Sequence, residues 1–226
     1  MISRQTNYLK GAITKMKRLF ASVISCVLIL SMICSGLTVF ATTITGAVDT
    51  DNFVRGVDVS TLDMLEDLGA RYYQNNVESD ALTILKNNGA NYVRLKLWVD
   101  PYDENGNPYG GGNNDYATTL ALARRAKNLG MGVLIDFHLS DFWTDPANQI
   151  KPKAWKDLSY SELKTTLYNY MKDTLNNFAA AGIVPEMVQV GNEISTGILH
   201  DDGKVGNGNE DFSNLAGLLE SAIAGV

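Results

Sequence analysis

Residues 131–138 read MGVLIDFH, an apolar run that closes on Asp136, Phe137 and His138. A continuous apolar run of this length is typical of a strand that is buried on both faces of a parallel sheet. Polar residues where such a strand ends lie at the carboxyl edge of the sheet, the edge at which α/β proteins bind their ligands. The stretch therefore predicts an α/β fold with its chemistry at that edge.

Strand-like and helical stretches alternate on both sides of this run. Three further strands are predicted at residues 53–60 (FVRGVDVS), 92–99 (YVRLKLWV) and 187–191 (MVQVG). Helical patterns cover residues 80–88, 115–129 and 161–181, each stopped by a glycine, and a fourth helix begins near residue 211. Ser159 and Glu162 have the spacing of a capping box before the third helix. Such alternation implies parallel strands joined by helical crossovers.

Two architectures fit this alternation, a doubly wound sheet and a (β/α)8 TIM barrel. No Gly-x-Gly-x-x-Gly follows the first strand, so the fingerprint of a dinucleotide-binding fold is missing. Polar residues instead gather at or just past the strand ends: Asp58, Arg94, Asp136, His138, Asn192 and Glu193. Catalytic residues of barrels lie at that rim. We therefore predict a TIM barrel, of which this chain supplies about the first four βα units.

The first 41 residues differ in composition from the rest. They contain five basic residues and no acidic ones, and an apolar run extends over residues 19–41. The run ends in Val39-Phe40-Ala41, the small-x-small pattern of a signal-peptidase site. We predict a signal peptide over residues 1–41 and part of a catalytic domain over residues 42–226. An uncleaved membrane anchor is the alternative, because the run is long enough to span a bilayer.

Charge and composition exclude several classes of function. The chain of 226 residues has 19 basic and 25 acidic residues, and loss of the leader would leave 14 basic residues and a net charge of −11. Such a protein lacks the basic face of a nucleic-acid binder. Both cysteines lie in the leader, and two histidines are too few for a histidine-rich metal centre. We expect a secreted, extracellular enzyme with no nucleic-acid partner and no stable membrane association after cleavage.

Gly191-Asn192-Glu193-Ile194 closes the fourth predicted strand. A glutamate that emerges from an apolar strand is expected to be partly desolvated, which raises a carboxyl pKa towards the range of a general acid. Asn192 could donate a hydrogen bond to a sugar hydroxyl beside the bond being cleaved. A solvated glutamate in an ordinary turn is the alternative, and the position after a fourth βα strand favours the catalytic interpretation.

A dense set of polar and aromatic side chains follows the third strand. Asp136 and His138 point the same way on an extended strand, and Trp143 could offer a flat face to a sugar ring. A metal site is an alternative, but one histidine among scattered aspartates has no recognised ligand spacing. Asp141 is expected to belong to a structural network.

Arg94 and Lys96 alternate within the second strand, so both face the same side. Two cations on a buried face need carboxylate partners, for which Asp58 and Glu193 are candidates. Arg94 is therefore expected to orient other groups more than to bind substrate itself. Trp98 could contact a polysaccharide or belong to the core, and the loop that follows it carries three tyrosines that could line a groove: Tyr102, Tyr109 and Tyr116.

Four blocks together resemble a known family: GVDVS (56–60), VRLKLWVDPYDENGNPYGGGNNDY (93–116), VLIDFHLSDFWTDPANQIKPKAW (133–155) and VQVGNEI (188–194). They are similar to the arabinogalactan endo-β-1,4-galactanases of glycoside hydrolase family 53, collinearly from Gly56 to about Leu219. The resemblance implies a (β/α)8 barrel that hydrolyses β-1,4-galactan with retention of configuration. It also implies that Glu193 is the acid/base. Lys96, Asp100 and Leu139 depart from the family pattern, and Leu139 puts one sugar contact in question.

The residues and the resemblance together predict the site. Glu193 is the predicted catalytic residue. The predicted substrate-binding residues are Asn192, His138, Asp136, Arg94, Trp143, Asp58 and Trp98. No cofactor is expected, and the calcium site found in some family members would lie outside this chain. The predicted partner is pectic galactan.

A retaining glycosidase needs two carboxyl groups about 5 Å apart. The resemblance places the nucleophile at the end of a seventh strand, whereas none of the acidic residues after Glu193 follows a predicted strand. We therefore expect the N-terminal half of a secreted endo-galactanase, truncated before its nucleophile and inactive alone. The alternatives are a non-catalytic half-barrel that only binds galactan, and a barrel glycanase that acts on another β-glycan.

Overall fold

The computed structural model describes residues 53–206, 208 and 210–226. The predicted signal peptide lies outside the described residues. Within them, no helix combines the length and the apolar character needed to cross a bilayer.

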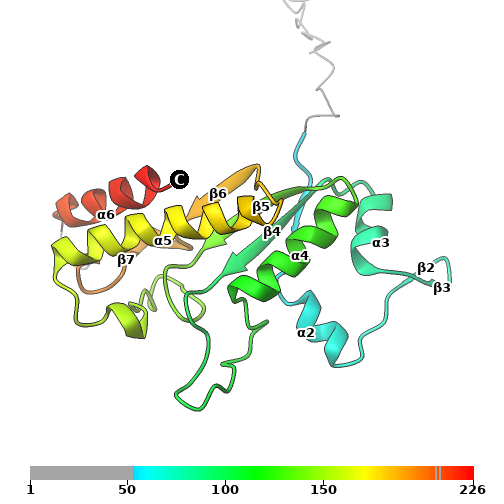
Figure 1. The fold of residues 1–226 in the computed structure, drawn as a ribbon, viewed down its shortest axis with the longest axis horizontal. Helices are drawn as coiled ribbons and strands as arrows, with labels where there is room; N and C mark the ends of the chain where they lie inside the picture. The colour runs from blue at the N-terminus through cyan, green and yellow to red at the C-terminus, as the bar shows by residue number, and fades with distance from the viewer. Residues whose placement is uncertain (1–52, 207, 209) are drawn as a thin grey trace, which may run out of the picture. The chain divides into compact units, whose positions relative to one another are not determined.

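A four-stranded parallel sheet forms the centre of the fold (Figure 1). Its strands are β1 (Gly56–Asp58), β4 (Tyr92–Leu97), β5 (Gly132–Phe137) and β6 (Met187–Val190). They lie side by side in chain order, with Val93 paired to Val133 and Asp136 to Gln189. All four predicted strands are confirmed, although β1 is shorter than the predicted residues 53–60.

Helices connect the strands and cover the sheet. They are α2 (Leu62–Asp67), α3 (Ala81–Asn87), α4 (Tyr116–Asn128), α5 (Tyr160–Ala180) and α6 (Ser213–Ala224). The predicted starts are confirmed by their caps: Asp80 accepts from the backbone of Thr83, and Ser159 and Glu162 form the capping box. The sequence pattern missed α2, because six residues are too few to show a helical period.

Several short elements were also not predicted. They are the hairpin β2 (Tyr73–Gln74) and β3 (Val77–Glu78), the hairpin β7 (Gly197–Ile198) and β8 (Gly203–Lys204), and the 3-10 turns η1 (Lys153–Trp155) and η2 (Ile194–Thr196). Each of these strands has two residues and each 3-10 turn has three. Their formation therefore depends on the surrounding structure more than on a local sequence pattern.

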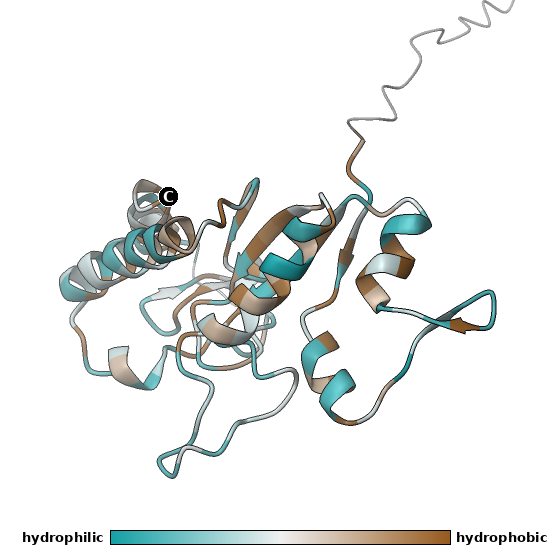
Figure 2. Cartoon of the chain, turned by 45° about the vertical axis from the view of Figure 1, so that its right-hand side comes forward, coloured by the Kyte–Doolittle hydropathy of each residue, from teal (hydrophilic) through white to brown (hydrophobic). Residues whose placement is uncertain are grey.

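One face of the sheet packs against helices. Val93, Leu95, Val133 and Ile135 are completely buried in a cluster that includes residues of α4 and α5. In Figure 2 the central strands are largely brown, whereas α4 and α5 carry both teal and brown stretches, as expected for helices with one buried side. Because side chains alternate along a strand, the residues between these apolar ones, such as Arg94, point to the opposite face.

Candidate active site

Arg94 is the centre of a polar cluster on that opposite face. Its guanidinium donates to Asp58 Oδ2 at 2.6 Å, to Asp136 Oδ2 at 2.6 Å and to Gln189 Oε1 at 3.2 Å. It also donates to Asn192 Oδ1 at 2.8 Å. One side chain of β4 thus bonds to a residue from each of the other three strands and to the turn after β6. The structure thus brings together four residues of the predicted site, namely Arg94, Asp58, Asp136 and Asn192.

Lys96 lies beside Arg94 in the same cluster. Its Nζ is 2.7 Å from Asp58 Oδ2 and 4.5 Å from the centre of the Trp143 ring. Within the described residues neither cation pairs with Glu193, so the predicted partnership of Glu193 is wrong and Asp136 takes that place. The Lys96 ammonium lies over the Trp143 ring as in a cation–π contact. Trp143 is nevertheless 40% exposed, so part of its side chain remains available to a ligand.

His138 is completely buried beside Asp136. The backbone N–H of Thr144 donates to His138 Nδ1 at 3.0 Å, so Nδ1 is the acceptor and the ring proton is on Nε2. Nε2 lies 2.9 Å from Asp136 Oδ2 but is poorly aligned for a hydrogen bond with it. The predicted proximity of Asp136 and His138 is confirmed.

Asn192 and Glu193 form a tight turn directly after β6. Gly191 has φ +85°, and a Cβ there would lie 2.6 Å from Ile194, so only glycine fits. Asn192 is buried, and its Nδ2 donates to the carbonyl of Thr144 at 2.7 Å. The side chain of Glu193 is exposed, and its backbone adopts the left-handed helical conformation, with φ 52° and ψ 46°. The predicted partial desolvation of Glu193 is therefore wrong for the described residues, because the turn carries it beyond the buried cluster.

The aromatic residues divide into buried and exposed groups. Trp98 is 1% exposed and packs against Phe142, so it presents no face for a sugar to stack on. Leu139 is also buried. Of the three tyrosines predicted to line a groove, Tyr109 is exposed, whereas Tyr102 donates to Asp115 and Tyr116 packs against Phe178. Tyr102 and Tyr116 are thus held by Asp115 and by Phe178 of α5, so the three tyrosines do not line a common groove as predicted.

Asp141 has the structural role that was predicted for it. Its carboxylate accepts from the backbone N–H of Asp100 at 3.0 Å and from that of Lys153 at 2.8 Å. These bonds join the loops that follow β4 and β5. Sequence reasoning missed three residues that contact the site: Gln189, Thr144 and Gln149, whose Nε2 donates to the Asn192 carbonyl. Gln189 could have been found from its polar position between Val188 and Val190, but the two loop residues carried no periodic signal.

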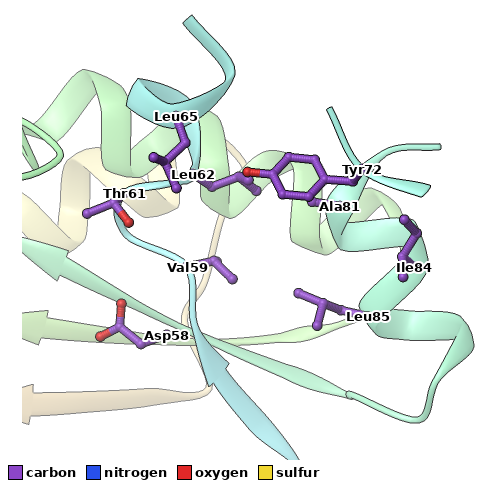
Figure 3. A pocket seen from close by; sticks show the side chains of 9 residues that line it. All are labelled: Asp58, Val59, Thr61, Leu62, Leu65, Tyr72, Ala81, Ile84 and Leu85. Atoms are coloured by element: carbon purple, nitrogen blue, oxygen red, sulfur yellow. The ribbon is translucent and has the colours of Figure 1, made fainter. Parts of the chain in front are cut away.

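A pocket of about 260 Å³ lies between β1, α2 and α3, and Asp58 of the Arg94 cluster is among the residues that line it (Figure 3). Its walls are mostly apolar and include Leu62, Tyr72, Ile84 and Leu85. A sugar site needs several convergent hydrogen-bonding groups, so this pocket is a poor candidate for one. The described residues also contain no group of three His, Cys, Asp or Glu side chains that could hold a metal ion.

The pKa of Asp58 makes the stability of the cluster depend on pH. Burial raises the pKa of this carboxyl, but hydrogen bonds from Lys96 and Ser60 outweigh burial and hold the pKa below its ordinary value. A carboxyl with a lowered pKa stabilises the fold above its ordinary pKa, and this contribution is lost as the pH falls through the lowered value. We expect the free energy of unfolding to fall from about pH 5 downwards, and to fall less in Asp58→Asn.

Urea denaturation of the purified chain at a series of acidic pH values measures this slope. Asp67→Asn, on an exposed position of α2, is the matched control and should follow the unsubstituted chain. If Asp58→Asn has the same pH slope as the unsubstituted chain, Asp58 does not carry the effect.

Comparison with known proteins identifies the family. The model of glycosyl hydrolase family 53 matches residues 54–226. The endo-beta-1,4-galactanase of Bacillus subtilis (strain 168) is 48% identical over 147 residues, which are 65% of this chain and 34% of that protein. The arabinogalactan endo-beta-1,4-galactanase A of Aspergillus niger is 42% identical over 173 residues, which are 76% of this chain and 46% of that protein.

Solved structures agree with these relatives. The GH53 catalytic domain of Ignisphaera aggregans superposes with a TM-score of 0.74 and 48% identity, over 80% of this chain and 49% of that one. A fungal beta-1,4-galactanase superposes with a TM-score of 0.69 and 40% identity, over 76% and 48%. The chain spans about half the length of these structures, and its sheet is part of the predicted α/β barrel. The chain belongs to glycosyl hydrolase family 53.

Proposed function

We propose that the chain is part of a secreted, endo-acting glycoside hydrolase that cleaves β-1,4-galactan, with Glu193 as the acid/base. The observation that carries the proposal is the Asn192–Glu193 turn at the end of β6, where Asn192 is tied to the Arg94 cluster and Glu193 is exposed to a ligand. Relatives from a bacterium and a fungus are named as galactanases. The predicted leader supports secretion.

In the proposed reaction, Glu193 first protonates the glycosidic oxygen and later takes a proton from the attacking water. Because Glu193 is exposed among the described residues, the desolvation that tunes a general acid has to come from the bound substrate or from residues outside the described ones. Asn192 uses one N–H for the Thr144 carbonyl, which leaves the second free to donate to a sugar hydroxyl. Trp143 offers an exposed ring for stacking beside the cluster.

Retention requires a second carboxylate as the nucleophile. Asp58 and Asp136 are the other strand-end carboxylates of the sheet, and both accept short bonds from cationic groups. Such pairing weakens a carboxylate as a nucleophile, so these two residues act as supports. We propose that the nucleophile comes from outside the described residues and that these residues alone do not hydrolyse galactan. A two-carboxylate mechanism needs no cofactor.

The test compares the purified chain with a joined protein. In the joined protein, the chain is fused to the part of the Ignisphaera aggregans GH53 catalytic domain that the chain does not cover. We expect the chain alone to release no reducing sugar from galactan. The joined protein should release it at least about tenfold faster from galactan than from mannan or cellulose, since a polar site rejects wrong hydroxyl patterns.

Two results would contradict the proposal. Faster release from mannan or cellulose would indicate a glycanase for another β-glycan. A folded joined protein that binds galactan without cleaving it would favour the non-catalytic alternative. Circular dichroism before each assay establishes that the joined protein is folded.

A further inference from the structure

We propose that Gln149 is a positioning residue that holds the turn of Glu193 in its active conformation; this inference rests on the proposed function. Gln149 lies in the loop between β5 and α5 and is only 2% exposed. It is 43 residues from Asn192 in the chain, yet its side chain reaches the turn directly.

One amide nitrogen of Gln149 serves the carbonyls of the turn. Nε2 donates to the carbonyl of Asn192 at 2.8 Å and to that of Asp145 at 3.2 Å, and it lies 3.4 Å from the carbonyl of Glu193. The carbonyl of Gly191 is served in the same way by Gln189 Nε2 at 2.9 Å. The carbonyls of Gly191 and Asn192 therefore each receive a side-chain amide donor, and Gln149 makes a longer contact with the carbonyl of Glu193.

The turn needs such support because its backbone is strained. Glu193 has a positive φ, a conformation that costs a non-glycine residue free energy and persists only where the surroundings stabilise it. The only other side-chain donor to the Asn192 carbonyl within the described residues is the Thr144 hydroxyl, at 3.4 Å. Loss of the Gln149 amide would leave this buried carbonyl with a single long bond.

The loop that carries Gln149 is itself fixed to the segment after Glu193. The carbonyl of Gln149 accepts from the backbone N–H of His200 at 2.7 Å, and the carbonyl of Pro146 accepts from the Thr196 hydroxyl at 2.6 Å. Gln149 is thus held on its backbone side while its amide holds the turn. A side chain fixed in this way can transmit a defined position to Glu193.

Displacement of Glu193 should impair proton transfer to the leaving group and little else. Galactan has a poor leaving group that needs the general acid, whereas a dinitrophenyl β-galactobioside releases a stable phenolate without protonation. If Gln149 positions Glu193, its loss should therefore lower activity on galactan much more than on the aryl substrate. A general loss of folding would lower activity on both substrates equally. The comparison uses kcat/KM, which reports the first bond cleavage.

The experiment places Gln149→Met in the joined protein, with Asn148→Ala as the matched control. Asn148 is the exposed neighbour of Gln149, and among the described residues its side chain bonds only to Asp145. We expect Gln149→Met to lower kcat/KM on galactan by about 10- to 100-fold, the effect of a misplaced catalytic group. On the aryl substrate it should change by less than about threefold, and Asn148→Ala should match the unsubstituted protein on both.

Equal losses on both substrates, or no loss on galactan, would overturn the role of Gln149. A crystal structure of the Gln149→Met chain tests the same inference without activity: we expect Glu193 to leave the left-handed conformation or to lose its order. An unchanged turn overturns the inference. If the unsubstituted joined protein cleaves neither substrate, the proposed function fails, and the structure of the variant still decides the role of Gln149.

Discussion

Replacement of Glu193 by glutamine is expected to lower galactan hydrolysis by the joined protein by about 10²- to 10⁴-fold, the usual contribution of general acid–base catalysis. The amide has nearly the same shape as the carboxyl group but cannot transfer a proton at neutral pH. Glu193 is exposed and pairs with no cation among the described residues, so the substitution should leave the fold intact.

Initial rates on galactan and on the dinitrophenyl substrate measure this effect. The variant should keep most of its kcat/KM on the aryl substrate, because that leaving group needs no proton. Glu220→Gln, an exposed glutamate on α6, is the matched control and should behave as the unsubstituted protein. If Glu193→Gln keeps more than about a tenth of its activity on galactan, another residue is the acid/base.

Replacement of Arg94 by methionine is expected to lower the free energy of unfolding by about 3 kcal/mol. Asp136 is completely buried, and without Arg94 the poorly aligned His138 would be its only charged or titratable partner among the described residues. This loss is at the lower end of the usual range of about 3–5 kcal/mol, because the Arg94 side chain is itself 27% exposed.

Urea denaturation of the joined protein measures this loss. Arg125 is the matched control, since it also bridges two carboxylates, Glu66 and Asp80, but both are partly exposed. Arg125→Met should therefore cost only about 1 kcal/mol or less. Adding Asp136→Asn to Arg94→Met should recover part of the loss, because it removes the stranded charge. Equal losses in the two arginine variants would contradict the proposed importance of the buried carboxylate.

The helices show how much of this fold local sequence could predict. Asp80, Asp115 and Ser159 begin α3, α4 and α5, and each accepts from a backbone N–H three residues later. Such caps lie within one turn of chain, so a sequence pattern is enough to find them. The unpredicted elements lack any local period. The β2–β3 hairpin, for example, has two residues in each strand around Asn75 and Asn76.

For the site, the sequence determined which strand residues share a face of the sheet. The alternation of β4 and β5 places Arg94, Lys96 and Asp136 on one face, because side chains on a strand alternate strictly. The turn after β6 places Asn192 beside them. The family and the general location of the chemistry were therefore predictable from the sequence.

Only the tertiary structure decided the partners and the exposure. It pairs Arg94 with Asp136, leaves Glu193 exposed, buries Trp98 and brings Gln149 to the turn. These outcomes depend on how the loop after β5 docks on the segment after β6, through contacts between residues more than 40 positions apart. A local pattern carries no information about such contacts, since many loop conformations suit the same residues until the sheet brings the two segments together.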